Sequence, residues 1–333
     1  MATATRSGSA SPAHAAPRRQ ALQASLQVLG IGAFYVLIVL FFSLASSDFL
    51  TTSNVLNILT NVSVIGIVAL GQALAIISGG FDLSVGGVVP LGAVAFALLT
   101  NAGAPVSLAI PAVVAAGGGV GLVNGLIVTK LGINPLITTL GTLSISVGSA
   151  YSLSSGVTIP FSNMAAGVLA DQPWTGVSYY LLAFVLLGLA AFLVLRFTVF
   201  GRMLYAIGGN REASRLAGLR VDLVTILVYM LCAALAAFAG IVVASQLLAG
   251  SATVGTDAAL TSIAAVVLGG ASLAGGVGGI PGTLIGVLVL GTIANGMVLL
   301  QIPAFYQQIA TGVILLLGVS FARLREMLSG EQG

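Results

Sequence analysis

The most restrictive feature of the sequence is the stretch between Asp257 and Arg323, because no residue between these two carries a charged side chain. Within it, segments 262–273, 282–300 and 305–319 are almost wholly apolar and are bounded by glycine or proline. An Asp, Lys or Arg at the centre of a bilayer costs roughly 2.5–3.5 kcal/mol, so membrane-spanning helices exclude these residues. The sequence therefore predicts an integral membrane protein.

Composition agrees and limits the number of spans. Of 333 residues, 58% are hydrophobic and only 6% are charged, whereas an ordinary soluble domain is about 25% charged. A span needs about 20 apolar residues, so the chain has room for about ten. We predict an all-α fold with about ten transmembrane helices, in a single domain over 21–325 between cytoplasmic tails at 1–20 (disordered) and 326–333. The expected spans are 26–45, 54–78, 83–100 (short, with a broken helix as the alternative), 105–128, 135–154, 178–197, 223–248, 258–274, 281–300 and 304–322.

The positive charges predict the orientation. With ten spans and an inside N-terminus, all 11 Lys and Arg residues fall on the inside, as membrane proteins prefer. Both termini are then cytoplasmic, and the outside segments hold only Asp48, Asp171 and Asp257. The inside set is Arg6, Arg18, Arg19, Lys130, Arg196, Arg202, Arg211, Arg215, Arg220, Arg323 and Arg325.

The sequence lacks the motifs of several kinds of chemistry. Its one lysine, Lys130, follows Thr129, so there is no Gly-Lys-Ser/Thr phosphate loop. We find no catalytic Ser/His/Asp set and no metal-ligand cluster, and we expect no catalytic residue, cofactor or metal. Asp82 is the single candidate for an ionisable group within the membrane, which disfavours proton or ion coupling.

The polar side chains inside the spans are mainly amides and hydroxyls. Such groups can hydrogen-bond a neutral polyhydroxylated solute, or they can simply bond to the backbone and to neighbouring helices, as polar residues do in lipid. We take Gln72, Asn124, Thr138 and Asn295, together with Asp82, as candidates for the translocation path. Asp82 has a second interpretation, because the segment 78–87 breaks one helix and starts another, where an Asp is a favourable N-cap.

The two halves of the sequence resemble each other. Residues 121–128 (GLVNGLIV) are echoed by residues 292–299 (TIANGMVL), so Asn124 and Asn295 occupy matching positions. They fall in the fourth and ninth expected spans, which run in opposite directions. This pattern favours an inverted-topology repeat, with the substrate path near the interface of the repeats.

Glycines recur at helical contact spacing. They stand four residues apart at positions 117, 121 and 125, and again at 278, 282 and 286, a spacing that lets helix backbones approach closely in lipid. The glycine clusters just before Pro281 indicate a break between helices.

The segment 198–222 is the longest charged loop. Residues 210–218 fit a short helix with Asn210 as N-cap and Gly218 just past its end, and Glu212 and Arg215 could pair on one face. Such a short helix is marginal in water, so it needs a docking partner. The alternative interpretation is a solvated loop that anchors the chain at the membrane surface.

Three stretches in this order, 78–86 (SGGFDLSVG), 201–218 (GRMLYAIGGNREASRLAG) and 264–276 (AAVVLGGASLAGG), resemble the sugar permeases of the ribose/xylose/galactose type. These are membrane subunits of bacterial ABC importers, and the resemblance covers roughly residues 50–322. It implies a cobalamin-importer-like (type II) fold in the inner membrane, with ten helices and an inverted relation between helices 2–5 and 7–10.

The resemblance also implies a function and partners. The chain would import a monosaccharide, driven by ATP hydrolysis in a separate subunit, as a homodimer with a periplasmic or lipid-anchored binding protein that contacts Asp171 and Asp257. Alternatives are import of nucleosides or branched-chain amino acids on the same fold, or a stand-alone ion-coupled secondary transporter. The ATPase would dock on the loop residues Arg202, Gly209, Asn210, Arg211, Glu212, Ala213, Arg215 and Gly218.

Overall fold

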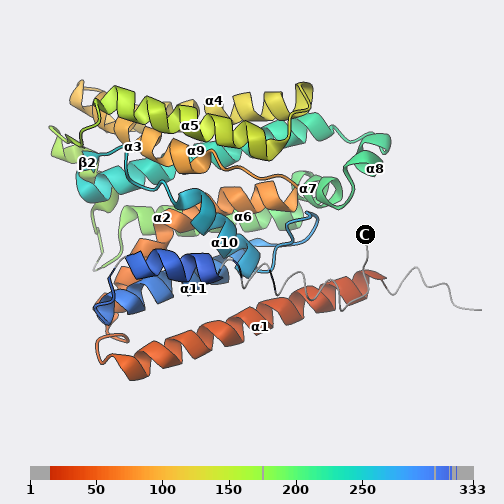
Figure 1. Ribbon diagram of the computed structural model, residues 1–333, viewed down its shortest axis with the longest axis horizontal. Coiled ribbons are helices and arrows are strands. Elements are labelled where there is room, and N and C mark those ends of the chain that lie inside the picture. Colours follow the sequence, from red (N-terminus) through yellow and green to blue (C-terminus); the bar gives the residue numbers. More distant parts are fainter. Residues whose placement is uncertain (1–15, 175, 304, 315, 317–319, 321–333) are drawn as a thin grey trace, which may run out of the picture.

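The computed structural model describes residues 16–174, 176–303, 305–314, 316 and 320, with side chains from Gly30 onward. The expected tails therefore lie largely outside the described residues, and the expected tenth span at 304–322 is described only in part. The elements are α1 (Ala16–Ala45), α2 (Thr52–Ile77), α3 (Val85–Asn101), α4 (Val106–Lys130), α5 (Pro135–Ser154), β1 (Ile159–Pro160), η2 (Met164–Ala170), α6 (Tyr179–Phe197), α7 (Val199–Gly209), α8 (Arg211–Leu216), α9 (Val221–Leu247), β2 (Ala249–Gly250), α10 (Ala258–Leu268) and α11 (Ile280–Leu299) (Figure 1).

Among the described residues, six helices are long and apolar enough to cross a membrane, namely α2, α4, α5, α6, α9 and α11. They match the expected spans to within a few residues. Large apolar side chains are exposed on the outer helices, for example Leu44 (89%) on α1 and Leu186 (65%) on α6, as helices facing lipid require. The chain is a multi-pass, mainly helical membrane protein.

Two of the expected spans differ in detail. The span 83–100 is one continuous helix, α3, although Pro90 lies inside it. The span 258–274 is too long, because α10 ends at Leu268. A glycine-rich connection follows, in which Gly270, Gly275 and Gly276 take left-handed φ values of 91°, 90° and 73°, which glycine adopts without steric cost.

Glycine contacts set the closest helix packing. A Cβ placed on Gly117 of α4 would lie 2.8 Å from the Ala233 carbonyl oxygen of α9, and one on Gly125 would lie 2.7 Å from the Cα of Ile226. Neither leaves room for a side chain, so the backbones of α4 and α9 touch. The expected role of this glycine series in helix packing is confirmed.

The bundle has two distinct ends, which we call the β end and the α8 end. At the β end, β1 pairs antiparallel with β2, with Ile159 opposite Gly250. At the other end α7 and α8 project from the bundle (Figure 1). Figure 1 also shows α1 along one side and α4 and α5 on the opposite side, with α2, α3, α9 and α10 between them.

Candidate functional site

The charged segment 198–222 contains two helices rather than the single short one expected. Thr198 caps α7 by accepting a 3.2 Å hydrogen bond from the Gly201 N–H. Asn210 caps α8 by accepting a 2.8 Å hydrogen bond from the Ala213 N–H. Gly218 follows α8 with a left-handed φ of 82°. The predicted cap and terminating glycine of α8 are therefore confirmed, whereas α7 was not foreseen.

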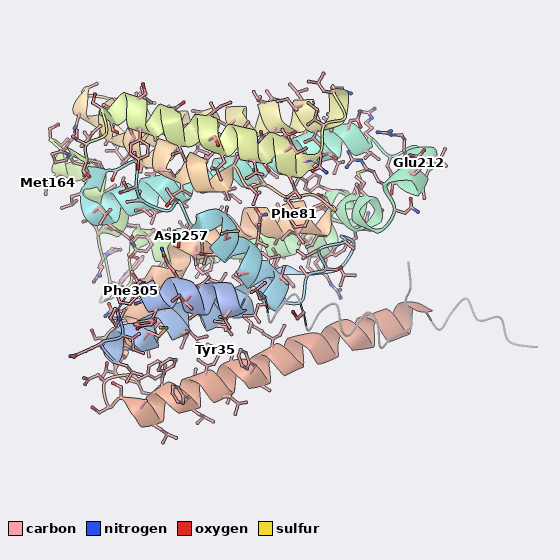
Figure 2. All side chains as sticks on the ribbon, in the orientation of Figure 1. Tyr35, Phe81, Met164, Glu212, Asp257 and Phe305 are labelled. Atoms are coloured by element: carbon pink, nitrogen blue, oxygen red, sulfur yellow. The ribbon has the colours of Figure 1, made fainter. Side chains whose placement is uncertain are left out.

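The surface of α8 faces away from the bundle. Arg211, Glu212 and Ala213 are exposed, and Leu216 is 82% exposed. Figure 2 shows Glu212 at the outermost edge of the α8 end. A helix of 6 residues gains little stability by itself, which fits the expected need of α8 for a docking partner.

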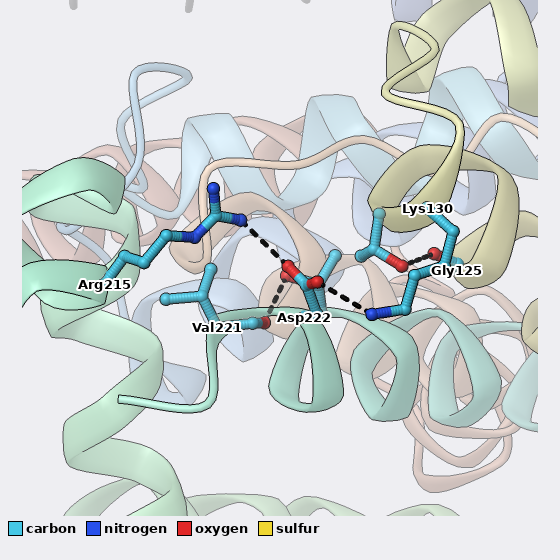
Figure 3. Close-up of polar contacts among 7 residues, drawn as sticks. Gly125, Lys130, Arg215, Val221 and Asp222 are labelled. Atoms are coloured by element: carbon cyan, nitrogen blue, oxygen red, sulfur yellow. Dashed lines mark hydrogen bonds and ion pairs between the residues drawn. The ribbon is translucent and has the colours of Figure 1, made fainter. Parts of the chain in front are cut away.

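Asp222 connects α8 to the bundle (Figure 3). Its carboxylate lies 3.0 Å from the Arg215 guanidinium and 3.0 Å from the Lys130 ammonium at the end of α4. The expected pairing of Glu212 with Arg215 is wrong, because Arg215 turns toward α9. Both basic side chains are more than half exposed, so each pair contributes only about 0–1 kcal/mol and chiefly orients α8.

Behind α8, three segments meet at a glycine junction made of Gly79, Gly208, Gly275 and Gly276. The Gly276 N–H donates a 2.9 Å hydrogen bond to the Ile77 carbonyl at the end of α2. A Cβ on Gly208, near the end of α7, would lie 2.5 Å from the Gly276 nitrogen, and one on Gly275 would lie 2.8 Å from the Cα of Gly79. The end of α7 therefore contacts both the α2–α3 and the α10–α11 connection through backbone atoms.

The rest of α7 adds one further tether. The Tyr205 hydroxyl donates a 2.9 Å hydrogen bond to the Gly278 carbonyl, and burial raises the pKa of this phenol, which keeps it a donor. Arg202 and Gly209 are exposed on α7. A displacement of α7 must therefore move the connection between α10 and α11.

A buried polar cluster lies close to this junction. Asp82 is fully buried, and its Oδ1 accepts hydrogen bonds from the Ser84 N–H (3.0 Å) and the Ser84 hydroxyl. Asn124 of α4 donates from Nδ2 to the Ser84 hydroxyl oxygen at 2.9 Å. The N-cap residue of α3 is Ser84, so the capping role expected of Asp82 is corrected: Asp82 instead fixes the turn before α3, and Ser84 links that turn to α4.

The other candidates for the translocation path are also buried or paired. Gln72 is fully buried and its Oε1 lies 3.7 Å from the Cys232 sulfur. Thr138 is buried in the first turn of α5. Asn295 exchanges two amide hydrogen bonds, of 2.9 and 3.0 Å, with Asn54 of α2. None of the five candidates borders the cavity of about 300 Å³ at the start of α10.

Four buried side-chain atoms in the described part of the chain have no hydrogen-bond partner: Gln72 Nε2, Asp82 Oδ2, Asn124 Oδ1 and Thr138 Oγ1. Buried polar atoms are normally bonded, so each one marks a place for a water molecule or a rearrangement. Within the same described residues, no group of three or more His, Cys, Asp and Glu side chains could hold a metal ion.

The two acidic residues expected at the outer face lie in different places. Asp171 is exposed after η2 at the β end, where its carbonyl accepts the Tyr179 N–H. Asp257 instead stands just before α10 and borders a cavity of about 300 Å³ together with Asn61, Gln246 and Thr261. Asn61 and Gln246 were not among the residues predicted from the sequence, although each is an amide in a strongly apolar helix.

Comparison with known proteins gives the family. The family described as "Branched-chain amino acid transport system / permease component" matches residues 54–319. The L-arabinose ABC transporter permease protein AraH of Azospirillum brasilense is 39% identical over 88% of this chain and 87% of its own length. The ribose import permease proteins RbsC of Bacillus subtilis (36%; 90% and 93%) and Escherichia coli K12 (40%; 83% and 88%) are similarly close. No solved structure matches the chain significantly.

These matches cover most of the chain and confirm the resemblance to permeases of bacterial sugar importers. They include α7, α8 and both glycine-rich connections, which all lie within residues 54–319. The chain belongs to the branched-chain amino acid transport system / permease component family.

Proposed function

We propose that the chain is the membrane permease subunit of an ABC importer that carries a monosaccharide of the ribose, xylose, galactose or arabinose class. The similarity to permeases named for ribose and L-arabinose supports the cargo class. A separate cytoplasmic subunit hydrolyses ATP, since this sequence has no Gly-Lys-Ser/Thr loop.

The finer architecture is part of the proposal. Ten helices, with an inverted relation between helices 2–5 and 7–10, form a type II permease that works as a homodimer in the inner membrane. Both termini and the α8 end face the cytoplasm, which agrees with the position of Lys130 and the arginines of α7 and α8. A periplasmic or lipid-anchored binding protein delivers the sugar at the β end, where Asp171 is exposed.

The observation that carries the proposal is the short, exposed helix α8 at the end of the bundle. Leu216 is 82% exposed on this short capped helix. The preceding helix, α7, contacts the glycine junction through Gly208. Closure of an ATPase dimer would push α8, and α7 would transmit the push to the α2–α3 and α10–α11 connections. Those connections border the helices that must rock for the path to open.

The test is reconstitution in proteoliposomes with the partner ATPase and binding protein. We expect ATP-driven uptake of a monosaccharide only when all components are present, and Leu216→Glu should abolish uptake and the stimulation of ATP hydrolysis by the loaded binding protein. The matched control is Leu131→Glu, another exposed leucine (69%) just past the end of α4.

Two results would contradict the proposal. Concentrative uptake by this chain alone, driven by a proton or sodium gradient, would favour a secondary transporter. Competition of uptake by branched-chain amino acids or nucleosides, with no effect of pentoses or hexoses, would keep the fold and change the cargo.

A further inference from the structure

The start of α10 lies inside the bundle rather than at its β end. With 11 residues at 1.5 Å each, α10 covers about 16 Å, roughly half of a hydrocarbon core that is about 30 Å thick. Its far end leads into the glycine junction, so its N-terminus must stop within the membrane. Figure 2 shows Asp257 within the length of the bundle, between Met164 at one end and Glu212 at the other.

A cavity opens beside this half-helix. It measures about 300 Å³ and is bordered by α2, α3, α9 and α10. Its polar groups are Asn61 of α2, Gln246 of α9, Asp257 and Thr261 of α10, and the rest of the lining is apolar apart from backbone, with valines such as Val68, Val89 and Val243.

The two amides of the cavity have no hydrogen-bond partner among the described residues. Asn61 and Gln246 are exposed side chains, and no other described residue forms a hydrogen bond with either. Asn61 stands about 13 Å along α2 from Thr52, by helical rise, too far from the helix end to reach the lipid headgroups. An unpaired amide in hydrocarbon costs several kcal/mol, so this side chain requires a polar partner within the cavity.

The chemistry of the cavity fits a neutral sugar. A monosaccharide offers several hydroxyl groups that both donate and accept, and amides, a hydroxyl and a carboxylate satisfy both roles. The Thr261 hydroxyl is only at the limit of hydrogen-bond distance, 3.5 Å, from Asp257 Oδ2, so both groups are open to a better partner. The volume lies at the lower limit for small-molecule pockets, which matches one sugar ring rather than an oligosaccharide.

We propose that this cavity is the site at which the permease holds a monosaccharide during translocation, with Asn61, Gln246, Asp257 and Thr261 as its hydrogen-bonding groups. The inference rests on the proposed function and names its substrate site. Because the far end of α10 leads into the glycine junction, a push on α7 moves Asp257 and Thr261 relative to Asn61 and loosens their hold on the sugar.

The first test is uptake by the complete reconstituted importer. Asn61→Leu and Thr261→Val remove hydrogen-bonding atoms at nearly constant volume, and each should lower uptake about tenfold while the loaded binding protein still stimulates ATP hydrolysis. Thr100→Val is the matched control, since this hydroxyl bonds only to the carbonyls of Phe96 and Ala97 in its own helix.

The second test detects binding directly. The single natural cysteine, Cys232, is buried. In the Asn61→Cys variant, a maleimide should therefore react only with the introduced cysteine. Ribose or arabinose at millimolar concentration should slow this labelling several-fold and leave Leu44→Cys, an exposed position on α1, unaffected.

The outcomes separate the two proposals. Normal uptake by both cavity variants, together with no protection by sugar, would overturn this site and leave the proposed function intact. Protection by leucine or a nucleoside but not by sugar would overturn the substrate class of the site. Absence of any sugar uptake by the unmodified importer would overturn both proposals.

Discussion

The Ser84 hydroxyl joins two buried polar side chains, Asp82 and Asn124. It donates to Asp82 and accepts from Asn124, and all three residues are fully buried. An unpaired buried polar group costs about 1–3 kcal/mol. The cluster therefore fixes the α2–α3 connection against α4, whatever role it has during transport.

Ser84→Ala should for this reason lower the stability of the protein. It removes one partner from each neighbour, so we expect Tm in detergent to fall by about 3–6 °C. The control is Ser144→Ala, because the exposed Ser144 bonds only to the Leu140 carbonyl of its own helix. An unchanged Tm, together with a loss of sugar uptake, would instead place the cluster in the translocation path.

The amide pair of Asn54 and Asn295 allows a double-mutant cycle. Either single change to leucine leaves the other amide without its partner, whereas the double variant removes both. We expect the stability losses of the two single variants to add up to more than the loss of the double variant. The difference is the coupling energy, which should be about 1 kcal/mol when measured by denaturation in detergent. Additive losses would show that the pair is incidental, and that Asn295 is free for another role.

At the scale of single residues, the sequence predicted roles that depend on local chemistry. The cap at Asn210 and the turn at Gly218 need only their neighbours in the chain. The cavity residues Asn61 and Gln246 could not be separated from structural amides such as Asn54, because the difference lies in which helix faces them. That information depends on the position of α10, which no local pattern records.

At the scale of elements, hydropathy located the long spans and misplaced the end of α10. The segment after Leu268 carries no charged residue, so the expected span was continued through it to residue 274. Only the glycines at 269, 270, 275 and 276 distinguish the irregular connection from the helix. Similarly, α7 was missed because arginine and glycine made segment 199–209 look like a loop.

The glycine junction gives a prediction for a pair of adjacent residues. A Cβ on Gly208 would collide with the Ile77 carbonyl oxygen and the Gly276 nitrogen, while one on Gly209 would have nothing within 4 Å. Gly208→Ala should therefore displace α7, lower Tm by several degrees, about 3 °C or more, and weaken the coupling of ATP hydrolysis to uptake.

Gly209→Ala is the matched comparison for stability, and its Tm should stay within about 1 °C, because a surface alanine in a helix is favourable. Equal losses of stability in the two variants would mean that the junction is not tightly packed. Normal coupling in a folded Gly208→Ala protein would remove α7 from the transmission of force.

At the scale of the whole molecule, the basic residues gather at one end. Lys130 closes α4, Arg196 lies in the last turn of α6, and further arginines follow in α7, α8 and the turn before α9. The orientation predicted from the sequence depended on an even number of spans. The described helices bring the basic residues together at the α8 end whatever the number of spans. The positive-inside preference then supports the proposal that the α8 end faces the cytoplasm.

This orientation can be measured with two single cysteines in cells. Leu216 on α8 is 82% exposed and Met164 on η2 is 66% exposed. Figure 2 shows Met164 at the end of the bundle opposite Glu212 of α8, and the natural Cys232 is buried. A maleimide that does not cross membranes should label Met164→Cys in intact cells whose outer membrane has been made permeable. Leu216→Cys should react only after the inner membrane is opened. The reverse pattern would put α8 on the outside, where no ATPase could reach it, and the proposed coupling of ATP hydrolysis to α8 would fail.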